Sequence, residues 1–152
     1  MIQRIQTLYL LLAGLFPAFT LFVPLVVLSN AIDWLSLNSL GYEATAFPEM
    51  AGRHPYGLLV FTVLAVVLPL IALFGYKNRK KQMKWVNVSM LINVLWYVAL
   101  VVYTLSVQHR TDTIMNVQIG CAFPLLALLV LFLAKRAIKH DEALVRAADR
   151  IR

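Results

Sequence analysis

The sequence predicts an all-α membrane protein, a single domain built as a bundle of four transmembrane helices. Three observations lead to this expectation. The 152-residue chain is 61% hydrophobic and only 14% charged, which is far more apolar than an ordinary soluble domain. Apolar runs of about 20 residues without charge occur four times. The basic residues gather in short segments that fall on one side of these runs.

The four apolar runs are the predicted spans. A helix rises about 1.5 Å per residue, so about 20 residues cross a hydrocarbon core of ~30 Å. Because no water satisfies the backbone in lipid, such runs are expected to be helical. The first run is too long for a signal peptide and is expected to be retained. The spans cover residues 8–28, 57–76, 85–107 and 113–134, and prolines expected to kink them are Pro17, Pro24, Pro69 and Pro124.

The basic residues predict that both termini are cytoplasmic. In that orientation all of them except Arg53 and Arg110 lie inside the cell, as the positive-inside rule requires. The connection 77–84 is then a cytoplasmic loop and residues 30–55 form a periplasmic loop. The cytoplasmic loop is expected to contact anionic lipid headgroups through Lys77, Arg79, Lys80, Lys81 and Lys84.

The external segments differ in length. In the larger one, "WLSLN" and "YEATAF" alternate roughly between apolar and polar residues, and Ser39–Gly41 between them could turn. This pattern predicts a small β-hairpin over the bundle, which would need support from the helix ends. The other external link, Gln108–Asp112, is expected to be a simple turn.

The third span carries a stripe of polar side chains. Ser89, Asn93 and Tyr97 recur every four residues and therefore share one face of a helix. We expect them to hydrogen-bond to other helices, with Asn116 near the outer end of the fourth span as a candidate partner. The alternative is a small polar pocket or a face for another membrane protein. No ionisable residue lies mid-span, which argues against a proton-coupled transporter.

The sequence offers no motif for catalysis, a metal or a cofactor, and none is expected. The histidines lack the spacing of a metal site, no nucleophile motif is present, and the glycines are scattered. Cys121 is the single cysteine, so an intramolecular disulfide is excluded. An external site that uses His54 or His109 with Asp33 or Asp112 is the remaining enzymatic alternative.

The tail, residues 135–152, is expected to be a cytoplasmic helix nearly continuous with the fourth span. From Asp141 onward, small apolar residues such as Ala143 and Ala147 fill one arc, and charged residues such as Asp149 fill the opposite arc. Acidic and basic residues are balanced there, unlike a helix that lies on a membrane. We expect it to dock a partner, the alternative being a plain charged extension; the docking residues are Glu142, Leu144, Arg146, Ala147, Ala148, Arg150 and Ile151.

The two ends of the chain resemble a known family. "MIQRIQTLYLLLA" (1–13) and "DEALVRAADRIR" (141–152) are similar to a small inner-membrane family of Bacteroidota, catalogued as a domain of unknown function with four predicted spans. The resemblance implies the inner membrane of a Gram-negative bacterium, with the external loop in the periplasm. The family often has serine at the position of Ala147, so no hydroxyl-dependent role is carried over. The resemblance implies no activity.

The functional expectation is a non-enzymatic accessory or scaffold subunit of the inner membrane, not an enzyme. It would dock protein partners through its tail helix and third span, and contact a bilayer with anionic headgroups; no nucleic acid partner is expected. The first alternative is a small transporter or binder of an apolar or neutral ligand, with Asn93, Tyr97 and Asn116 lining a pocket. The second is the periplasm-facing enzyme described above.

Overall fold

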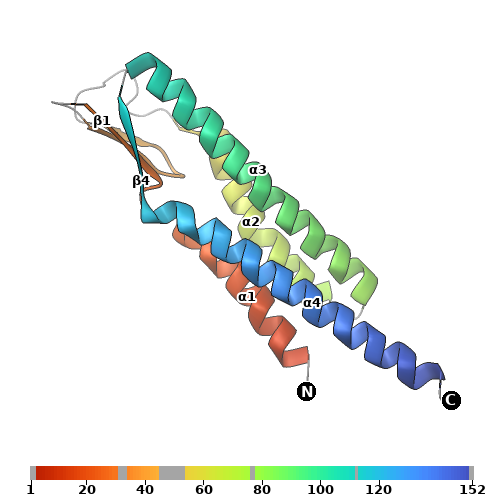
Figure 1. Ribbon diagram of the computed structural model, residues 1–152. Coiled ribbons are helices and arrows are strands. Elements are labelled where there is room, and N and C mark those ends of the chain that lie inside the picture. Colours follow the sequence, from red (N-terminus) through yellow and green to blue (C-terminus); the bar gives the residue numbers. More distant parts are fainter. Residues whose placement is uncertain (1–2, 31–33, 45–53, 76–77, 112, 151–152) are drawn as a thin grey trace.

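The computed structural model describes residues 3–30, 34–44, 54–75, 78–111 and 113–150 (Figure 1). In these residues, helices lie side by side and an antiparallel sheet covers one end of the bundle, whereas the two chain ends lie toward the opposite end. The helices are α1 (Gln3–Phe19), α2 (Tyr56–Phe74), α3 (Arg79–Thr111) and α4 (Ala122–Arg150). The strands are β1 (Val26–Ser29), β2 (Trp34–Leu37), β3 (Tyr42–Ala44) and β4 (Ile114–Val117), and a short 3₁₀ helix, η2, covers Ile119–Cys121.

The helices have the length and composition of membrane-spanning elements. Among the described residues, α2, α3 and α4 are each long and apolar enough to cross a membrane. The apolar part of α1, Ile5–Phe19, is shorter. Many large apolar side chains on the outer faces are exposed, as expected where lipid is the solvent. The protein is therefore a mostly helical membrane protein with a small sheet.

The prediction of one helix over residues 8–28 is wrong, because α1 ends at Phe19 and Val26–Ser29 form a strand. The helix ends in a turn in which the backbone N–H and the hydroxyl of Thr20 both donate to the Pro17 carbonyl, at 3.2 Å and 2.6 Å. Pro24 lies in the link to β1 and kinks no helix, whereas Pro17 does lie inside α1. A proline cannot donate a helical hydrogen bond, and the β-branched residues after it favour a strand.

The prediction for residues 113–134 fails in the same way. Ile114–Val117 form β4, and the helix begins only at Ala122. Pro124 therefore lies in the first turn of α4, where the missing N–H costs nothing and no kink results. The predicted turn before this segment is also wrong, since α3 continues through Thr111.

The predicted β-hairpin is confirmed and is part of a larger sheet. β2 pairs antiparallel with β3, with Leu37 opposite Tyr42, and the Asn38 N–H donates to the Gly41 carbonyl at 2.9 Å. β1 then pairs with β2 on one side and with β4 on the other, which gives the order β3-β2-β1-β4. The sheet thereby joins two segments that are far apart in the sequence.

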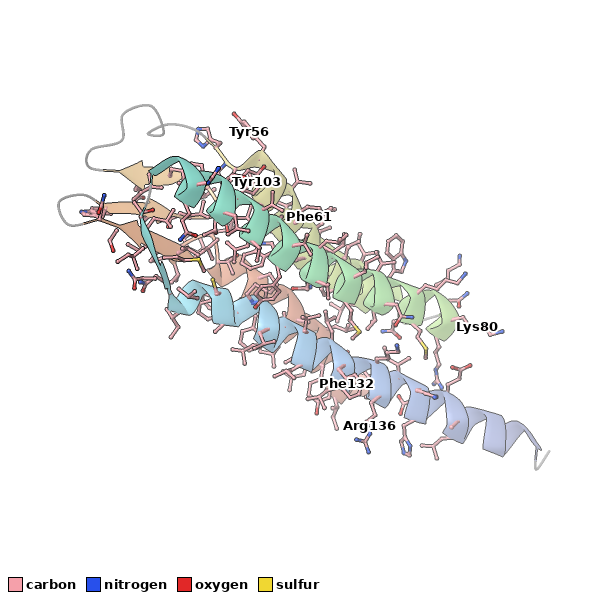
Figure 2. All side chains as sticks on the ribbon, turned by 45° about the horizontal axis from the view of Figure 1, so that its top comes forward. Tyr56, Phe61, Lys80, Tyr103, Phe132 and Arg136 are labelled. Atoms are coloured by element: carbon pink, nitrogen blue, oxygen red, sulfur yellow. The ribbon has the colours of Figure 1, made fainter. Side chains whose placement is uncertain are left out.

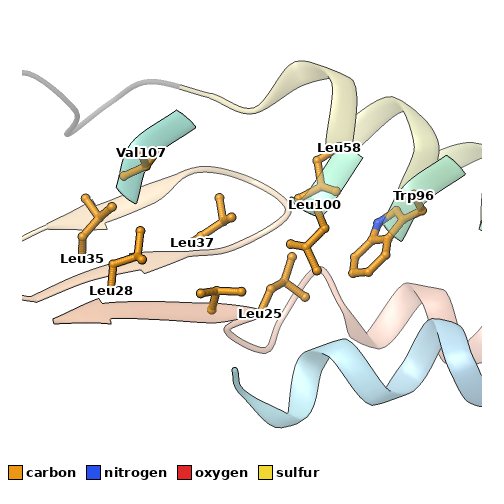
Figure 3. Packing of buried hydrophobic residues seen from close by; sticks show 9 residues of the cluster. Leu25, Leu28, Leu35, Leu37, Leu58, Trp96, Leu100 and Val107 are labelled. Atoms are coloured by element: carbon orange, nitrogen blue, oxygen red, sulfur yellow. The ribbon is translucent and has the colours of Figure 1, made fainter. Parts of the chain in front are cut away.

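Most of the buried apolar residues form two clusters toward opposite ends of the bundle. At the sheet end, leucines from the strands pack against Leu58 of α2 and against Trp96, Leu100 and Val107 of α3 (Figure 3). The cluster at the other end lies among the helices and includes small side chains; its buried members are Leu10, Ala13, Ala72, Val86, Leu131, Ala134 and Ile138. We call these the sheet-end cluster and the helical cluster.

Candidate functional site

The polar stripe of α3 lies inside the bundle. Ser89 and Asn93 are fully buried, so neither presents its side chain to a membrane partner. Their hydrogen bonds stay within α3: the Ser89 hydroxyl donates to the Trp85 carbonyl, and the Asn93 amide donates to the Ser89 carbonyl, both at 2.8 Å. Among the described residues, no group donates to the amide oxygen of Asn93.

Tyr97, the third residue of the stripe, and the neighbouring Trp96 each donate a hydrogen bond to another element. The Tyr97 hydroxyl donates to the Cys121 carbonyl at 2.5 Å, which joins α3 to η2. The Trp96 indole N–H donates to the Thr62 hydroxyl of α2 at 2.8 Å. Sequence reasoning missed this second pair, although a tryptophan and a threonine in adjacent spans each need a hydrogen-bond partner when buried.

Asn116 does not meet the polar stripe. It lies in β4 opposite Val27, is exposed, and donates from its side-chain amide to the Ser29 hydroxyl at 3.1 Å. The expected contact with the third span fails because residue 116 belongs to a strand and not to a helix. Of the three residues proposed to line a pocket, only Tyr97 lines a described cavity.

That cavity is an apolar groove between α3 and the edge of the sheet, with a volume of about 300 Å³. Met115 and Val117 of β4 lie opposite Leu28 and Val26 of β1, so they extend the sheet face that packs on α3. Because β4 lies at the edge of the sheet, its four residues are all exposed and the groove stays open along this side. The lining residues are Val26, Tyr97, Leu100, Val101, Thr104, Leu105, Met115, Val117 and Cys121; we call this the edge groove.

The predicted lipid-contact residues lie at the opposite end from the sheet. Figure 2 shows Lys80 and Arg136 at one end of the bundle and Tyr56 and Tyr103 at the other. Arg79, Lys80, Lys81 and Lys84 all lie in the first turns of α3. Asn78 precedes them and accepts the Lys81 N–H on its side-chain oxygen at 3.2 Å, as an N-cap residue does. Lys77 lies outside the described residues.

A polar cluster holds α4 where it leaves the bundle, and sequence reasoning missed it. Asp141 is only 6% exposed, and its carboxylate accepts a hydrogen bond from the Gln6 amide of α1, 135 residues away. The Arg79 guanidinium of α3 donates to the Asp141 backbone carbonyl at 2.8 Å. Asp141 is thus bound by two other helices, and we call this group the tail anchor.

Beyond the tail anchor, α4 continues to Arg150, which confirms the predicted tail helix. Figure 1 shows its last turns beyond the ends of α1 and α3. Leu144 is 47% exposed and Glu142 is partly exposed. The helix also contains Arg146, Ala147, Ala148 and Arg150, whose side-chain positions the structure does not describe. Ile151 lies outside the described residues.

His54 and His109, the histidines of the proposed external site, do not form a site among the described residues. One ring nitrogen of His54 lies 2.7 Å from the Leu40 carbonyl, which ties the start of α2 to the β2–β3 turn. His109 is exposed near the end of α3. Asp33 and Asp112, the proposed carboxylate partners, lie outside the described residues. Within the described parts of the chain, no group of three or more potential metal ligands occurs.

The comparisons with known proteins identify a family without a known activity. No curated protein matches the chain. One family model matches residues 2–151, almost the whole length of the sequence, and it is described as a domain of unknown function (DUF4293). The resemblance of the two termini is thereby confirmed at the level of the family. The chain belongs to the DUF4293 family.

Proposed function

We propose that the protein is a non-enzymatic accessory or scaffold subunit of a bacterial inner membrane, and that its C-terminal helix docks a cytoplasmic protein. One observation supports this function above others. The helix runs without a break from Ala122 to Arg150, and the tail anchor holds it at Asp141 against both α1 and α3.

The tail anchor makes the tail suitable for docking. A helix fixed at its root leaves the bundle in one direction, so a partner does not have to order it before binding. The exposed Leu144 lies at the start of the apolar arc expected from the sequence. The third span has no docking role in this proposal, because Ser89 and Asn93 are buried.

The proposal includes the orientation with both termini in the cytoplasm. The start of α1 and the end of α4 lie at the same end of the bundle (Figure 1), and this is also the end that carries Lys80 and Arg136 (Figure 2). The positive-inside rule assigns such an end to the cytoplasm. The sheet then faces the periplasm.

The test is site-specific photocross-linking in native membranes. The sequence pattern assigns position 147 to the apolar arc of the tail and position 149 to the charged arc, so a photoreactive residue is introduced at each. Docking predicts a discrete adduct from position 147 that is weak or absent from position 149. A plain charged extension predicts that the two positions give the same faint products, which would refute the docking function.

A second function is favoured by the edge groove: binding of an apolar ligand. The groove is lined by apolar residues together with Tyr97 and Thr104, and its volume of about 300 Å³ lies at the lower limit for small-molecule sites. A fluorescent fatty acid added to the purified protein would test this. Val101→Trp should fill the groove and reduce binding, whereas Val98→Trp, which changes an equally exposed residue outside the groove, should not. Equal binding of the fatty acid by Val101→Trp and Val98→Trp would exclude the edge groove as its site.

A further inference from the structure

A second groove lies between α1 and α4, at the end of the bundle opposite the sheet. Its volume is about 420 Å³. Ile5 and Tyr9 of α1 form one side, one helical turn apart. The other side comes from α4: Leu133, Arg136, Ala137 and His140. We call this hollow the basic groove.

The sequence of α4 explains why the groove is open. Leu133, Ala137 and His140 recur at intervals of four and three residues, so they share one face of the helix. The inner face of α4 is different and carries the buried residues Ala134, Ile138 and Asp141. Because Ala137 has the smallest side chain of the lining set, the space above it is left unfilled.

The groove has two chemical halves. At the end toward the tail, Arg136 and His140 are both exposed, lie one turn apart, and can donate hydrogen bonds to the same anion. Toward the middle of the bundle, exposed leucines continue along the same face of α4, namely Leu133, Leu129 and Leu126. Among the described residues, no carboxylate lines the groove.

We propose that the basic groove binds one anionic phospholipid of the bilayer. The headgroup phosphate contacts Arg136 and His140, and an acyl chain lies over Ala137 and along the exposed leucines of α4. The positive charge of Arg136 complements the negative charge of the headgroup, and Arg136 lies at the same end of the bundle as Lys80 (Figure 2). A soluble anion would use the two donors and leave the apolar half of the groove uncovered, so the proposal commits to a lipid. It is independent of any partner bound by the tail.

The test uses the full-length protein in detergent and native mass spectrometry. The two probes are phosphatidylglycerol and phosphatidylcholine with identical acyl chains. We expect one molecule of phosphatidylglycerol to be retained in preference to phosphatidylcholine. Arg136→Gln should weaken that preference about five-fold, the effect of removing one cation from an anionic headgroup. Lys135→Gln removes the same charge from the adjacent residue, which does not line the groove, and should leave the preference unchanged.

A second variant separates the shape of the groove from its charge. Ala137→Leu keeps every cation but fills the groove, and it should reduce phosphatidylglycerol binding at least as much as Arg136→Gln. Circular dichroism and gel filtration show whether each variant is folded. If Ala137→Leu is not folded, Arg136→Gln alone decides the test. Equal retention of the two lipids by the native protein, or equal losses in Arg136→Gln and Lys135→Gln, would overturn the proposal. So would displacement of the lipid by inorganic phosphate at the same concentration, because this outcome identifies a site for a free anion.

Discussion

The two ends of the bundle are held together by different interactions. At the sheet end, a buried tryptophan and leucines from strands and helices pack in one cluster. At the other end, the helical cluster includes small residues such as Ala13, Ala72 and Ala134, and the tail anchor joins α1, α3 and α4 by hydrogen bonds. Apolar packing stabilises both ends, but at the second end the helical cluster is supplemented by the hydrogen bonds of the tail anchor. We infer that the sheet end fixes the fold and that the opposite end is the one suited to exchange contacts with other molecules.

The largest expected effect comes from the centre of the sheet-end cluster. Trp96→Ala removes a side chain that is 1% exposed and leaves the Thr62 hydroxyl without its donor, so the free energy of unfolding should fall by about 3–5 kcal/mol. The measurement is unfolding in detergent by titration with sodium dodecyl sulfate. Trp85→Ala changes a tryptophan that is 39% exposed and should cost less than about 1 kcal/mol. Equal losses of unfolding free energy in Trp96→Ala and Trp85→Ala would mean that the sheet end is no better packed than the lipid-facing surface.

The next effect tests how closely η2 approaches the link before β1. A Cβ atom at Gly120 would lie 2.4 Å from the Pro24 carbonyl oxygen, and the backbone there is fixed by the Gln118 N–H, which donates to the Leu25 carbonyl at 2.9 Å. Gly120→Ala should therefore cost about 1–3 kcal/mol of unfolding free energy in the same titration.

Gly75→Ala is the matched control for that substitution. Its Cβ atom would meet no neighbouring atom closer than 3.9 Å, so the free energy of unfolding should change by no more than about 0.5 kcal/mol. If Gly120→Ala were equally neutral, the close approach of η2 to the Pro24–Leu25 link would be disproved.

The tail anchor should show an effect of similar size to that of Gly120→Ala, with strong coupling between two of its three residues, Gln6 and Asp141. Gln6→Ala and Asp141→Ala each leave a buried polar group without its partner, which costs about 1–3 kcal/mol. Because both remove the same hydrogen bond, the double variant should be less destabilised than the sum, by about 0.5–3 kcal/mol.

A distant pair calibrates this coupling. Asn38→Ala removes an exposed hydrogen bond to Glu43 at the sheet end, and its effect should add to that of Gln6→Ala within about 0.5 kcal/mol. If the losses of unfolding free energy in Gln6→Ala and Asp141→Ala were equally additive, the hydrogen bond between these residues would not be the interaction that holds the tail.

The smallest effect is expected at Asn116. Asn116→Ala removes one exposed hydrogen bond to Ser29 and should change the free energy of unfolding by no more than about 0.5 kcal/mol. Asn93→Ala empties a fully buried position and should cost more, about 1–2 kcal/mol. The sequence predicted that Asn116 is a partner of the polar stripe that contains Asn93. A coupling energy between Asn93→Ala and Asn116→Ala would support that contact and contradict the position of β4.

The sequence predicted the elements whose pattern is local. Apolar length revealed the helices, and the turn residues between Asn38 and Gly41 revealed the β2–β3 hairpin. It did not predict β1 and β4, because a short apolar strand has the same composition as part of an apolar helix. Pro24 and Pro124 were the available signals, since Pro24 lies just before β1 and Pro124 lies in the first turn of α4, after β4 and η2. A helix broken at these two positions would have left room for both strands.

The candidate sites were predicted less completely, because they depend on partners far apart in the sequence. The spacing of Ser89, Asn93 and Tyr97 correctly placed them on α3, but spacing does not tell which side of a helix faces lipid. Asp141 reads as one more charged residue in a solvated tail, and only the fold brings Gln6 to it. The edge groove exists because β4 lies beside β1, so it could not be predicted before the sheet was known.

The order of the strands has a consequence for biosynthesis. Three neighbouring strands of the sheet, β1 to β3, are complete once Ala44 has been made, but the fourth strand begins at Ile114. About 70 residues must be translated in between, which takes on the order of 4–14 s at roughly 5–20 residues per second. During this interval the edge of β1 has no neighbour and can pair with a strand of another chain. The nascent protein is therefore most prone to mispairing while α2 and α3 are being made and inserted, and the arrival of β4 ends that period.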